Sequence, residues 1–434
     1  MPVTNVVEAA MKTLATWGSH GPGAVFFLIW AMVLVFMMQL GFMFLESGQI
    51  RSKNATSIYM KCLMDVAVSG VAFMFLGFVI GWPEQSKGFI KWLSEIASAQ
   101  GFGANPMKSI WPWVMAYALF QWTFCNKAVT IVSGSVAERM KFKAYLIGTA
   151  VLSALVYPVF ARWVWGGGWL GGSNGWVAHV FGAPYHDFAG STVVHLFGGV
   201  AALMAAYLLG PRLGRFKDGK PTPIPGHNIP HVFLGTLVLV IGWYGFNVGS
   251  SAALWDPSTG EWVSALVAAN TTMCMFGSTL TAAAMSRFDP LWTANGILAG
   301  AVTVCAGADV MSPLGAFIAG LVAGAIMMPV YRWLEKKQID DVVAAFPVHG
   351  VCGAWGAIAA GIFGQKALGG AGGVSLAAQL LGVAVCFAYT GACAFVLYKL
   401  IDKAIGLRVD EKTEREGLDS AVFGVSPYPE FEIR

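Results

Sequence analysis

Long apolar runs alternate with short polar segments along most of the 434-residue chain. Each run has about 20 residues, the length at which a helix crosses a hydrocarbon core of roughly 30 Å. Eleven spans can be drawn, beginning near residues 24, 57, 111, 144, 190, 231, 262, 290, 313, 346 and 373. The pattern therefore predicts an all-α polytopic membrane protein with eleven transmembrane helices.

Composition agrees with a bilayer environment. Hydrophobic residues make up 56% of the chain and charged residues only 12%, against roughly a quarter charged in soluble domains. We expect an outer N-terminal segment over 1–23, a transmembrane domain over 24–402 and a cytosolic tail over 403–434. The first apolar run is too long for a typical signal-peptide core, so we take it as a true span.

Basic residues predict the orientation of the chain. With eleven spans the two termini lie on opposite sides of the membrane. The segments 51–53, 139–143, 212–220 and 332–337, together with the tail, place most Lys and Arg residues on one side. That side is cytoplasmic by the positive-inside rule. We expect the N-terminus outside and the tail inside, in the inner (plasma) membrane.

Several other functions are disfavoured by the residues present. The seven cysteines lie in apolar stretches without CxxC or Cys/His spacing, so they read as core residues rather than metal ligands. Basic residues form no single patch, which argues against nucleic-acid binding. No Ser/His/Asp order, phosphate loop or cofactor motif is present, so we expect no enzyme activity and no cofactor.

An Asp-x7-His spacing occurs twice, at Asp187/His195 and at Asp341/His349. In the predicted topology the first pair enters the membrane from outside and the second from inside. The chain would then be an inverted repeat of five plus five spans with a final helix, an arrangement common in transporters. Eight helical residues rise about 12 Å, so the two histidines are expected to meet near the membrane centre.

The same residues also have structural interpretations. An intramembrane histidine can simply hydrogen-bond a neighbouring helix, although two at matched offsets favour a proton relay or a hydrogen-bonding rail. Asp187 precedes Phe-Ala-Gly-Ser at a helix start, where a carboxylate caps free backbone N–H groups. We therefore prefer capping to direct ion contact for Asp187, with Asp341 as its counterpart. Pro347 is expected to bend the second helix.

Five segments resemble the Amt/Mep/Rh ammonium transporter family, with the Amt branch as the best fit. They read DFAGSTVVHLFGG (187–199), FPVHGVCGAWG (346–356), GWYGFNVGS (242–250), VWGGGWL (164–170) and LESGQIRSKN (45–54). The likeness extends in order from the first span to EREGLD (414–419), so it covers nearly the whole chain.

The resemblance implies a homotrimer with one pore in each subunit. It also implies an outer ammonium site at Trp165 and Ser250, where an aromatic face and a hydroxyl favour a small cation over neutral gas. Phe124 and Phe246 match the stacked phenylalanine gate below this site, with Phe120 one turn further out. Without the family motifs, all three phenylalanines would read as ordinary core or lipid-facing residues.

Below the gate, a bare ammonium ion in an apolar bore would lose solvation worth several kcal/mol, whereas ammonia is far cheaper to move. In the picture that the resemblance implies, ammonium loses its proton, and His195 and His349 line the bore and carry ammonia and the proton. Potassium cannot release a proton and would be excluded.

The tail segment GLRVDEKTEREGLD (406–419) resembles the family's cytosolic regulatory region, which in many members contacts PII signal proteins. The residues that follow, SAVFGVSPYPEFEIR, depart from the usual ending. We expect either a PII-type partner or a fused or partner signalling domain at the tail, and otherwise a disordered end.

Lys127 lies near the middle of the third span, where family members usually carry an apolar residue. Phe120, Phe124, Lys127 and Ile131 fall on one helix face, so the ammonium group is expected to point into the pore. There it could mimic the bound ion, repel ammonium or plug the bore. Alternatively it snorkels away or pairs with Asp65. Two hypotheses stay open: a transporter that tolerates the lysine, and a non-conducting ammonium receptor that signals through its tail.

Overall fold

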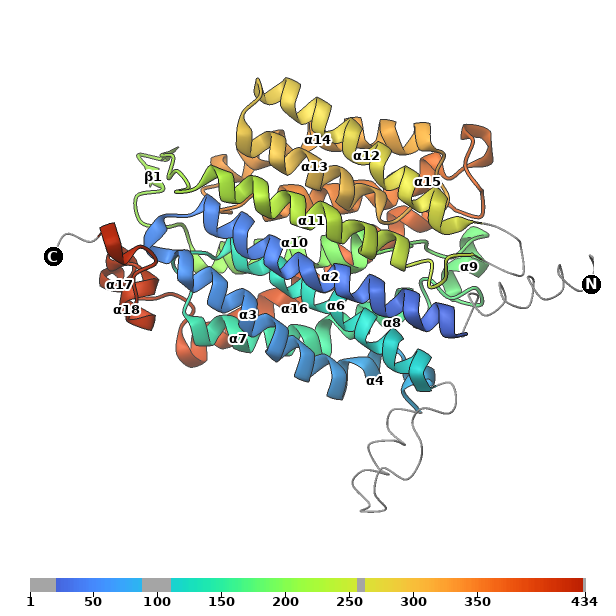
Figure 1. The fold of residues 1–434 in the computed structure, drawn as a ribbon, viewed down its shortest axis with the longest axis horizontal. Helices are drawn as coiled ribbons and strands as arrows, with labels where there is room; N and C mark the ends of the chain where they lie inside the picture. The colour runs from blue at the N-terminus through green and yellow to red at the C-terminus, as the bar shows by residue number, and fades with distance from the viewer. Residues whose placement is uncertain (1–20, 88–110, 256–261, 432–434) are drawn as a thin grey trace, which may run out of the picture.

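The computed structural model describes residues 21–87, 111–255 and 262–431. Long helices lie side by side along one axis of the molecule, as Figure 1 shows. We call the end that carries α17, α18 and the β1–β2 hairpin the tail end, and the end that carries α9 the opposite end. The predicted N-terminal segment 1–23 lies almost entirely outside the described residues, as do residues 432–434 of the predicted tail.

The elements that the structure describes in the first half of the chain are all helices. Its elements are α2 (Pro22–Gln49), η1 (Ser52–Asn54), α3 (Ala55–Ala72), η2 (Phe73–Gly77), α4 (Phe78–Gly81), α6 (Trp111–Ser135), α7 (Phe142–Val151), η4 (Leu152–Val156), α8 (Tyr157–Val164), α9 (Trp176–Phe181), η5 (Ser191–Leu196) and α10 (Phe197–Leu209).

The second half begins with a two-stranded hairpin. Its elements are β1 (Phe216–Lys217), β2 (Lys220–Pro221), α11 (Ile229–Gly249), α12 (Val263–Ser286), α13 (Pro290–Val304), α14 (Pro313–Lys336), η6 (Phe346–Val351), α15 (Cys352–Phe363), η7 (Lys366–Leu368), α16 (Leu376–Ile405), α17 (Glu411–Glu416), α18 (Leu418–Phe423) and η8 (Pro429–Phe431).

Nine helices within the described residues are long and apolar enough to cross a membrane. They correspond to nine of the eleven predicted spans, and helices also begin where the remaining two were expected. Of these, α6 carries Gln121, Asn126 and Lys127 in its middle, and α13 has only 15 residues. The chain is therefore an all-helical, multi-pass membrane protein.

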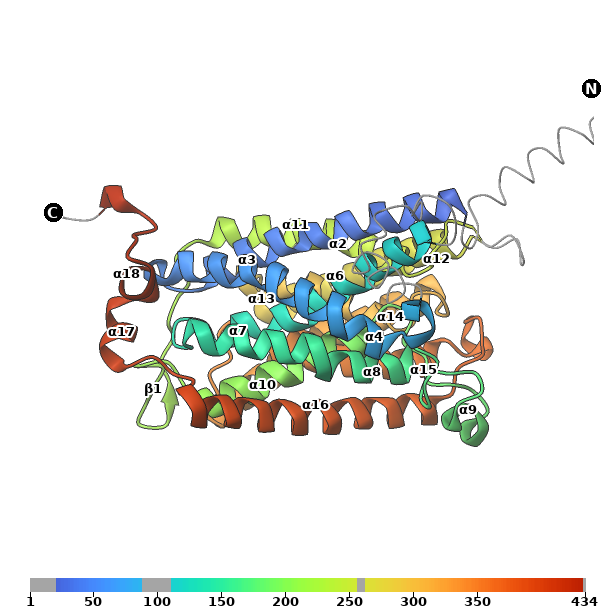
Figure 2. The ribbon, with the colours of Figure 1, turned by 90° about the horizontal axis from the view of Figure 1, so that it is seen from below.

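The two helices that carry the repeated histidines cross at the centre and run in opposite directions. The first, η5–α10, runs towards the tail end, where it leads into β1; the second, η6–α15, starts at the tail end (Figures 1 and 2). Both begin with one wide π-helical turn, η5 and η6. Such turns often lie at functional sites.

Small residues let these two helices touch. Gly199 lies four residues after His195, and a Cβ there would come 2.3 Å from the backbone nitrogen of Gly350. Gly353 lies four residues after His349, and its Cβ would come 2.3 Å from the carbonyl oxygen of Ser191. Since the obstructing atoms are backbone, the approach requires glycine in both helices.

A buried ion-pair cluster ties the loops together at the tail end. Arg212 is 4% exposed and pairs with Glu138 at 2.9 Å and Asp340 at 2.8 Å. Arg51 also pairs with Glu138, and the Arg139 guanidinium donates to the Asp340 carbonyl. Burial by itself raises the pKa of Asp340, but the charges of Arg139 and Arg212 outweigh it and hold the pKa of this carboxyl well below its usual range.

The tail folds back onto this cluster. The carboxylate of Asp419 in α18 accepts hydrogen bonds from Thr56 N at 2.8 Å and Ser57 N at 2.7 Å, and so caps the start of α3. The Glu414 carboxylate pairs with Arg408 and accepts from Leu213 N at 2.7 Å. The tail thus contacts the loops after α2 and after α10.

We predict that Gly199→Ala destabilises the protein by about 1–3 kcal/mol, because the added methyl meets backbone that cannot rotate away. The measurement is the unfolding midpoint of purified protein in detergent. Gly391→Ala is the matched control, since its Cβ would meet only Val200 at 3.7 Å. Equal midpoints for the two variants would contradict the close crossing.

Candidate functional site

Two aspartates cap the central helices in the same way. The Asp187 carboxylate accepts from the backbone N–H groups of Gly190, Thr192 and Val193 at 2.9–3.0 Å. The Asp341 carboxylate accepts hydrogen bonds from Ala345 N at 3.0 Å, from Phe346 N at 2.8 Å and from the Ser135 hydroxyl. Both carboxylates therefore hold helix starts, the role that the sequence favoured for Asp187.

The capped helices bring the two predicted histidines into contact at the centre. Their Nδ1 atoms are 3.1 Å apart, and the rings are nearly parallel at 14° with centroids 5.2 Å apart. A hydrogen bond at that distance requires one Nδ1 to donate and the other to accept. The His195 Nε2 is buried and has no hydrogen-bond partner among the described residues. The pair can therefore hold one shared proton and offers a free nitrogen.

A stacked pair of phenylalanines lies beside the histidines. The Phe124 and Phe246 rings are 4.0 Å apart and 17° from parallel, and both are essentially unexposed. Phe246 lies 5.3 Å from the His195 ring, and Phe124 lies 5.9 Å from the Trp165 ring. The rings thus form a continuous row from Trp165 to the histidines.

A cavity of about 220 Å³ opens at the Trp165 end of this row. Its lining includes Trp165, Ser250, Phe120 and Phe124 together with two residues that the sequence analysis missed, Tyr117 and Gln121. The three predicted residues Trp165, Ser250 and Phe120 are therefore brought together.

Hydrogen bonds fix the walls of this cavity. The Trp165 indole N–H donates to the Asp187 carbonyl at 2.6 Å, and the Ser250 hydroxyl donates to the Phe246 carbonyl at 2.9 Å. With its proton engaged, the Ser250 oxygen keeps lone pairs for a cation. The Gln121 Oε1 is buried and has no partner within the described residues. Tyr117, Gln121 and Phe124 follow i, i+4, i+7 spacing and so share one helix face. This spacing in the sequence could have identified Gln121 as a lining residue.

Lys127 is buried beside the row of rings. Its Nζ donates to Gln39 Oε1 on α2 and lies 6.0 Å from the centroid of Phe42. That phenylalanine ring is also 6.3 Å from the His349 ring. Among the described residues, Lys127 forms no ion pair with Asp65. The Asp65 carboxylate instead accepts hydrogen bonds from the hydroxyls of Tyr145 and Thr149. The ammonium group is therefore held towards α2.

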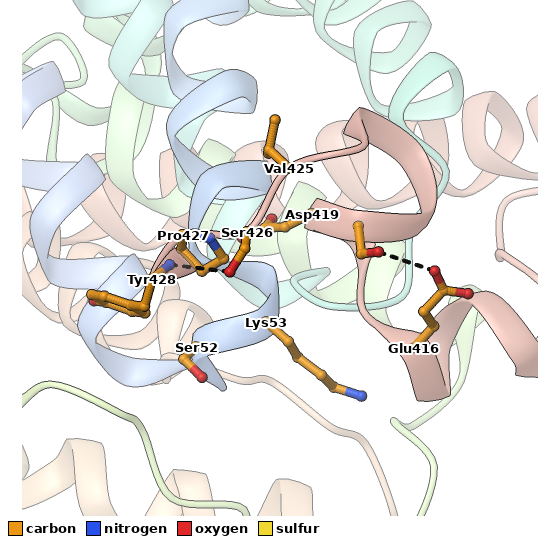
Figure 3. A pocket seen from close by; sticks show the side chains of 9 residues that line it. Ser52, Lys53, Glu416, Asp419, Val425, Ser426, Pro427 and Tyr428 are labelled. Atoms are coloured by element: carbon orange, nitrogen blue, oxygen red, sulfur yellow. Dashed lines mark hydrogen bonds between the residues drawn. The ribbon is translucent and has the colours of Figure 1, made fainter. Parts of the chain in front are cut away.

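A second cavity of about 380 Å³ lies under the tail (Figure 3). It is lined by Ser52 and Lys53 from the α2–α3 turn and by tail residues from Glu416 to Tyr428. The Lys53 ammonium donates to the carbonyls of Glu414 and Arg415. The tail is thus docked on the transmembrane domain.

An ion pair braces the loop that leads into η5. The His186 Nε2 lies 2.9 Å from Asp309 Oδ1, and its backbone N–H donates to Gln379. Burial by itself lowers the pKa of His186, but the charge and hydrogen bond of Asp309 outweigh burial and leave the pKa above its usual value. Among the described residues, no group of three or more His, Cys, Asp or Glu side chains could hold a metal.

Comparison with known proteins gives consistent matches. The profile of the Ammonium Transporter Family matches residues 25–428. The chain is 46% identical to ammonium transporter Amt2 of Methanocaldococcus jannaschii, covering 98% of this chain and 94% of that protein. It is 41% identical to Amt1 of the same organism, covering 94% and 97%.

Solved structures share the fold. A structure titled as a sensor Amt protein superposes with a TM-score of 0.79 at 31% identity, covering 92% of this chain and 98% of that chain. Candida albicans Mep2 superposes with a TM-score of 0.73 at 23% identity, covering 90% and 86%.

The His186–Asp309 pair makes stability depend on pH. Because the pKa of His186 is raised in the folded state, the pair stabilises fully below the unfolded pKa of roughly 6.5 and is lost as pH rises through the folded pKa. We expect the free energy of unfolding to fall by about 1–2 kcal/mol as His186 loses its proton. The unfolding midpoint between pH 6 and pH 9 measures it, and Asp309→Asn should remove this part of the pH dependence. An unchanged pH profile in Asp309→Asn would refute the linkage.

Proposed function

The chain belongs to the Ammonium Transporter Family, and from this premise we propose that it conducts ammonium by separating it into ammonia and a proton. The observation that carries the proposal is the unbroken row of rings from Trp165 through the stacked phenylalanines to the two histidines. A cation can be bound at one end of this row, and a proton can be held at the other.

Recruitment takes place in the outer cavity. The Trp165 ring and the aromatic wall attract a cation through their π-faces, and the Ser250 and Gln121 oxygens accept its N–H groups. Neutral ammonia gains little from the same surfaces. The cavity therefore concentrates the protonated form.

Deprotonation follows at the phenylalanine pair. Both rings are apolar and buried, so an ion that moves between them loses its water without a replacement. Ammonia carries no charge and moves at far lower cost. Potassium has no proton to release and is stopped at the same point.

The separated proton uses the histidine pair. When His195 Nε2 takes a proton, the proton on its Nδ1 can shift to the Nδ1 of His349 across 3.1 Å, and His349 releases its own Nε2 proton. Each imidazole then changes tautomer without moving. We propose His195 and His349 as the pore-lining residues of this proton relay.

We further propose eleven membrane spans arranged as an inverted repeat of five plus five with a final helix, the N-terminus outside and the tail inside. The opposed directions of η5–α10 and η6–α15 support this arrangement. A homotrimer is proposed from the family. The docked tail suits contact with a PII-type protein or a partner signalling domain on its cytosolic face.

A second candidate function is ammonium sensing without conduction. It is favoured by the buried Lys127 beside the ring that contacts His349, and by the likeness to the solved sensor Amt protein. We favour conduction because Gln39 on α2 holds the ammonium group of Lys127 by a hydrogen bond.

The test is ammonium-evoked current in liposomes that contain the native chain or Lys127→Ala. If Gln39 holds the lysine aside, the native chain conducts and the alanine variant changes the current by less than about tenfold. A silent native chain together with a conducting Lys127→Ala variant would establish the sensing function and reject transport.

His195→Ala should remove the proton relay. We expect the ammonium current to fall at least about tenfold, since a positioned proton-transfer group contributes 10²- to 10⁴-fold, while the protein stays monodisperse in size-exclusion chromatography. Current and potassium selectivity equal to those of the native chain would reject a pore-lining role for His195.

A further inference from the structure

Below the histidine pair, on the side of the tail end, lies a small cavity that contains a carboxylate. Its walls include His349, Asn295, Phe42 and Glu46, and its volume is about 10 Å³. That volume is near the lower limit for one water molecule. The imidazole of His349 and the carboxylate of Glu46 thus border one cavity of about the size of a single small molecule.

Glu46 is buried and its hydrogen bonding is incomplete. It is 1% exposed, and both of its oxygens lie 2.6–2.8 Å from one hydroxyl, that of Ser133. The same hydroxyl lies 2.7 Å from the Thr130 carbonyl oxygen. Its single proton is therefore shared among three acceptor oxygens. A carboxylate that accepts at most one hydrogen bond in an apolar wall has free acceptor positions.

Glu46 lies among other buried ionisable side chains. Lys61 on α3 interacts electrostatically with it, and the Lys61 Nζ is buried and has no hydrogen-bond partner among the described residues. With Asp65 and Lys127, these side chains make two acids and two bases inside the same part of the membrane domain. Of the four, only Glu46 lines the cavity next to His349. Ionisable groups at such positions are costly and are functional by default.

We propose that Glu46 is the proton acceptor on the tail side of the histidine pair, where the proton rejoins ammonia; this rests on the proposed conduction. The carboxylate takes the Nε2 proton of His349, directly or through one small molecule in the cavity, and becomes a neutral acid. The ammonia lone pair then takes the acid proton, forming ammonium and restoring the carboxylate. As His349 gives up its Nε2 proton, the Nδ1 proton of His195 moves to the Nδ1 of His349, and both rings return to their starting tautomers before the next proton passes.

The test uses the full chain in liposomes, with ammonium-evoked current as the readout. We expect Glu46→Gln to lower the current at least about tenfold, because the amide fills the same space but does not take up the proton. Glu46→Asp keeps an acid at the cavity and should restore part of the current. Recovery by Asp separates proton transfer from a structural role.

Asp65→Asn is the matched control. It neutralises the other buried carboxylate of the same group, which lies outside the cavity lining, and it should keep the current within about threefold of native. Equal losses in Glu46→Gln and Asp65→Asn, or no recovery in Glu46→Asp, would overturn the role of Glu46. A native chain without current would instead overturn the proposed function itself, whereas a conducting native chain with an equally conducting Glu46→Gln variant overturns only this inference.

Discussion

The cost of placing a charge in an apolar bore governs the rest of the structure. In the mechanism that we propose, stacked Phe124 and Phe246 offer an ammonium ion no hydrogen bond, so the ion stays in the cavity beside Trp165 and ammonia passes beyond it. In that mechanism the proton needs its own carrier, and the imidazoles of His195 and His349 are buried and in contact. Crossing glycines and capping aspartates serve to bring these two rings together.

Sequence reasoning reached much of this arrangement because its signals were local or periodic. Apolar runs predicted the long helices, and the repeated Asp-x7-His spacing predicted that His195 and His349 meet. It did not find Gln121 or Glu46. These residues become candidates because they line cavities. Which residues line a cavity depends on how each helix is rotated and packed, and composition does not determine this. The direction of Lys127 likewise depended on a partner, Gln39, on another helix.

Adjacent aspartates link the tail to the pore. Asp341 caps the helix that carries His349, while its neighbour Asp340 belongs to the ion-pair cluster with Arg212. Glu138 of the same cluster accepts from Asn54, whose side-chain oxygen receives the backbone N–H of Leu418 in the tail. A displacement of the tail would therefore strain contacts that end at Asp340, one residue before the aspartate that caps the helix of His349. Such a connection would couple the tail to the helix of His349 in a regulated transporter and equally in a sensor.

Simultaneous measurement of charge and nitrogen in one liposome experiment tests the central claim most directly. ¹⁵N-ammonium is supplied outside, and the accumulated label and the integrated current are recorded with potassium as the competing ion. Separation of ammonium into ammonia and a carried proton predicts about one elementary charge for each nitrogen and no potassium current. Nitrogen uptake without charge, or ammonium binding with neither uptake nor current, would contradict the account.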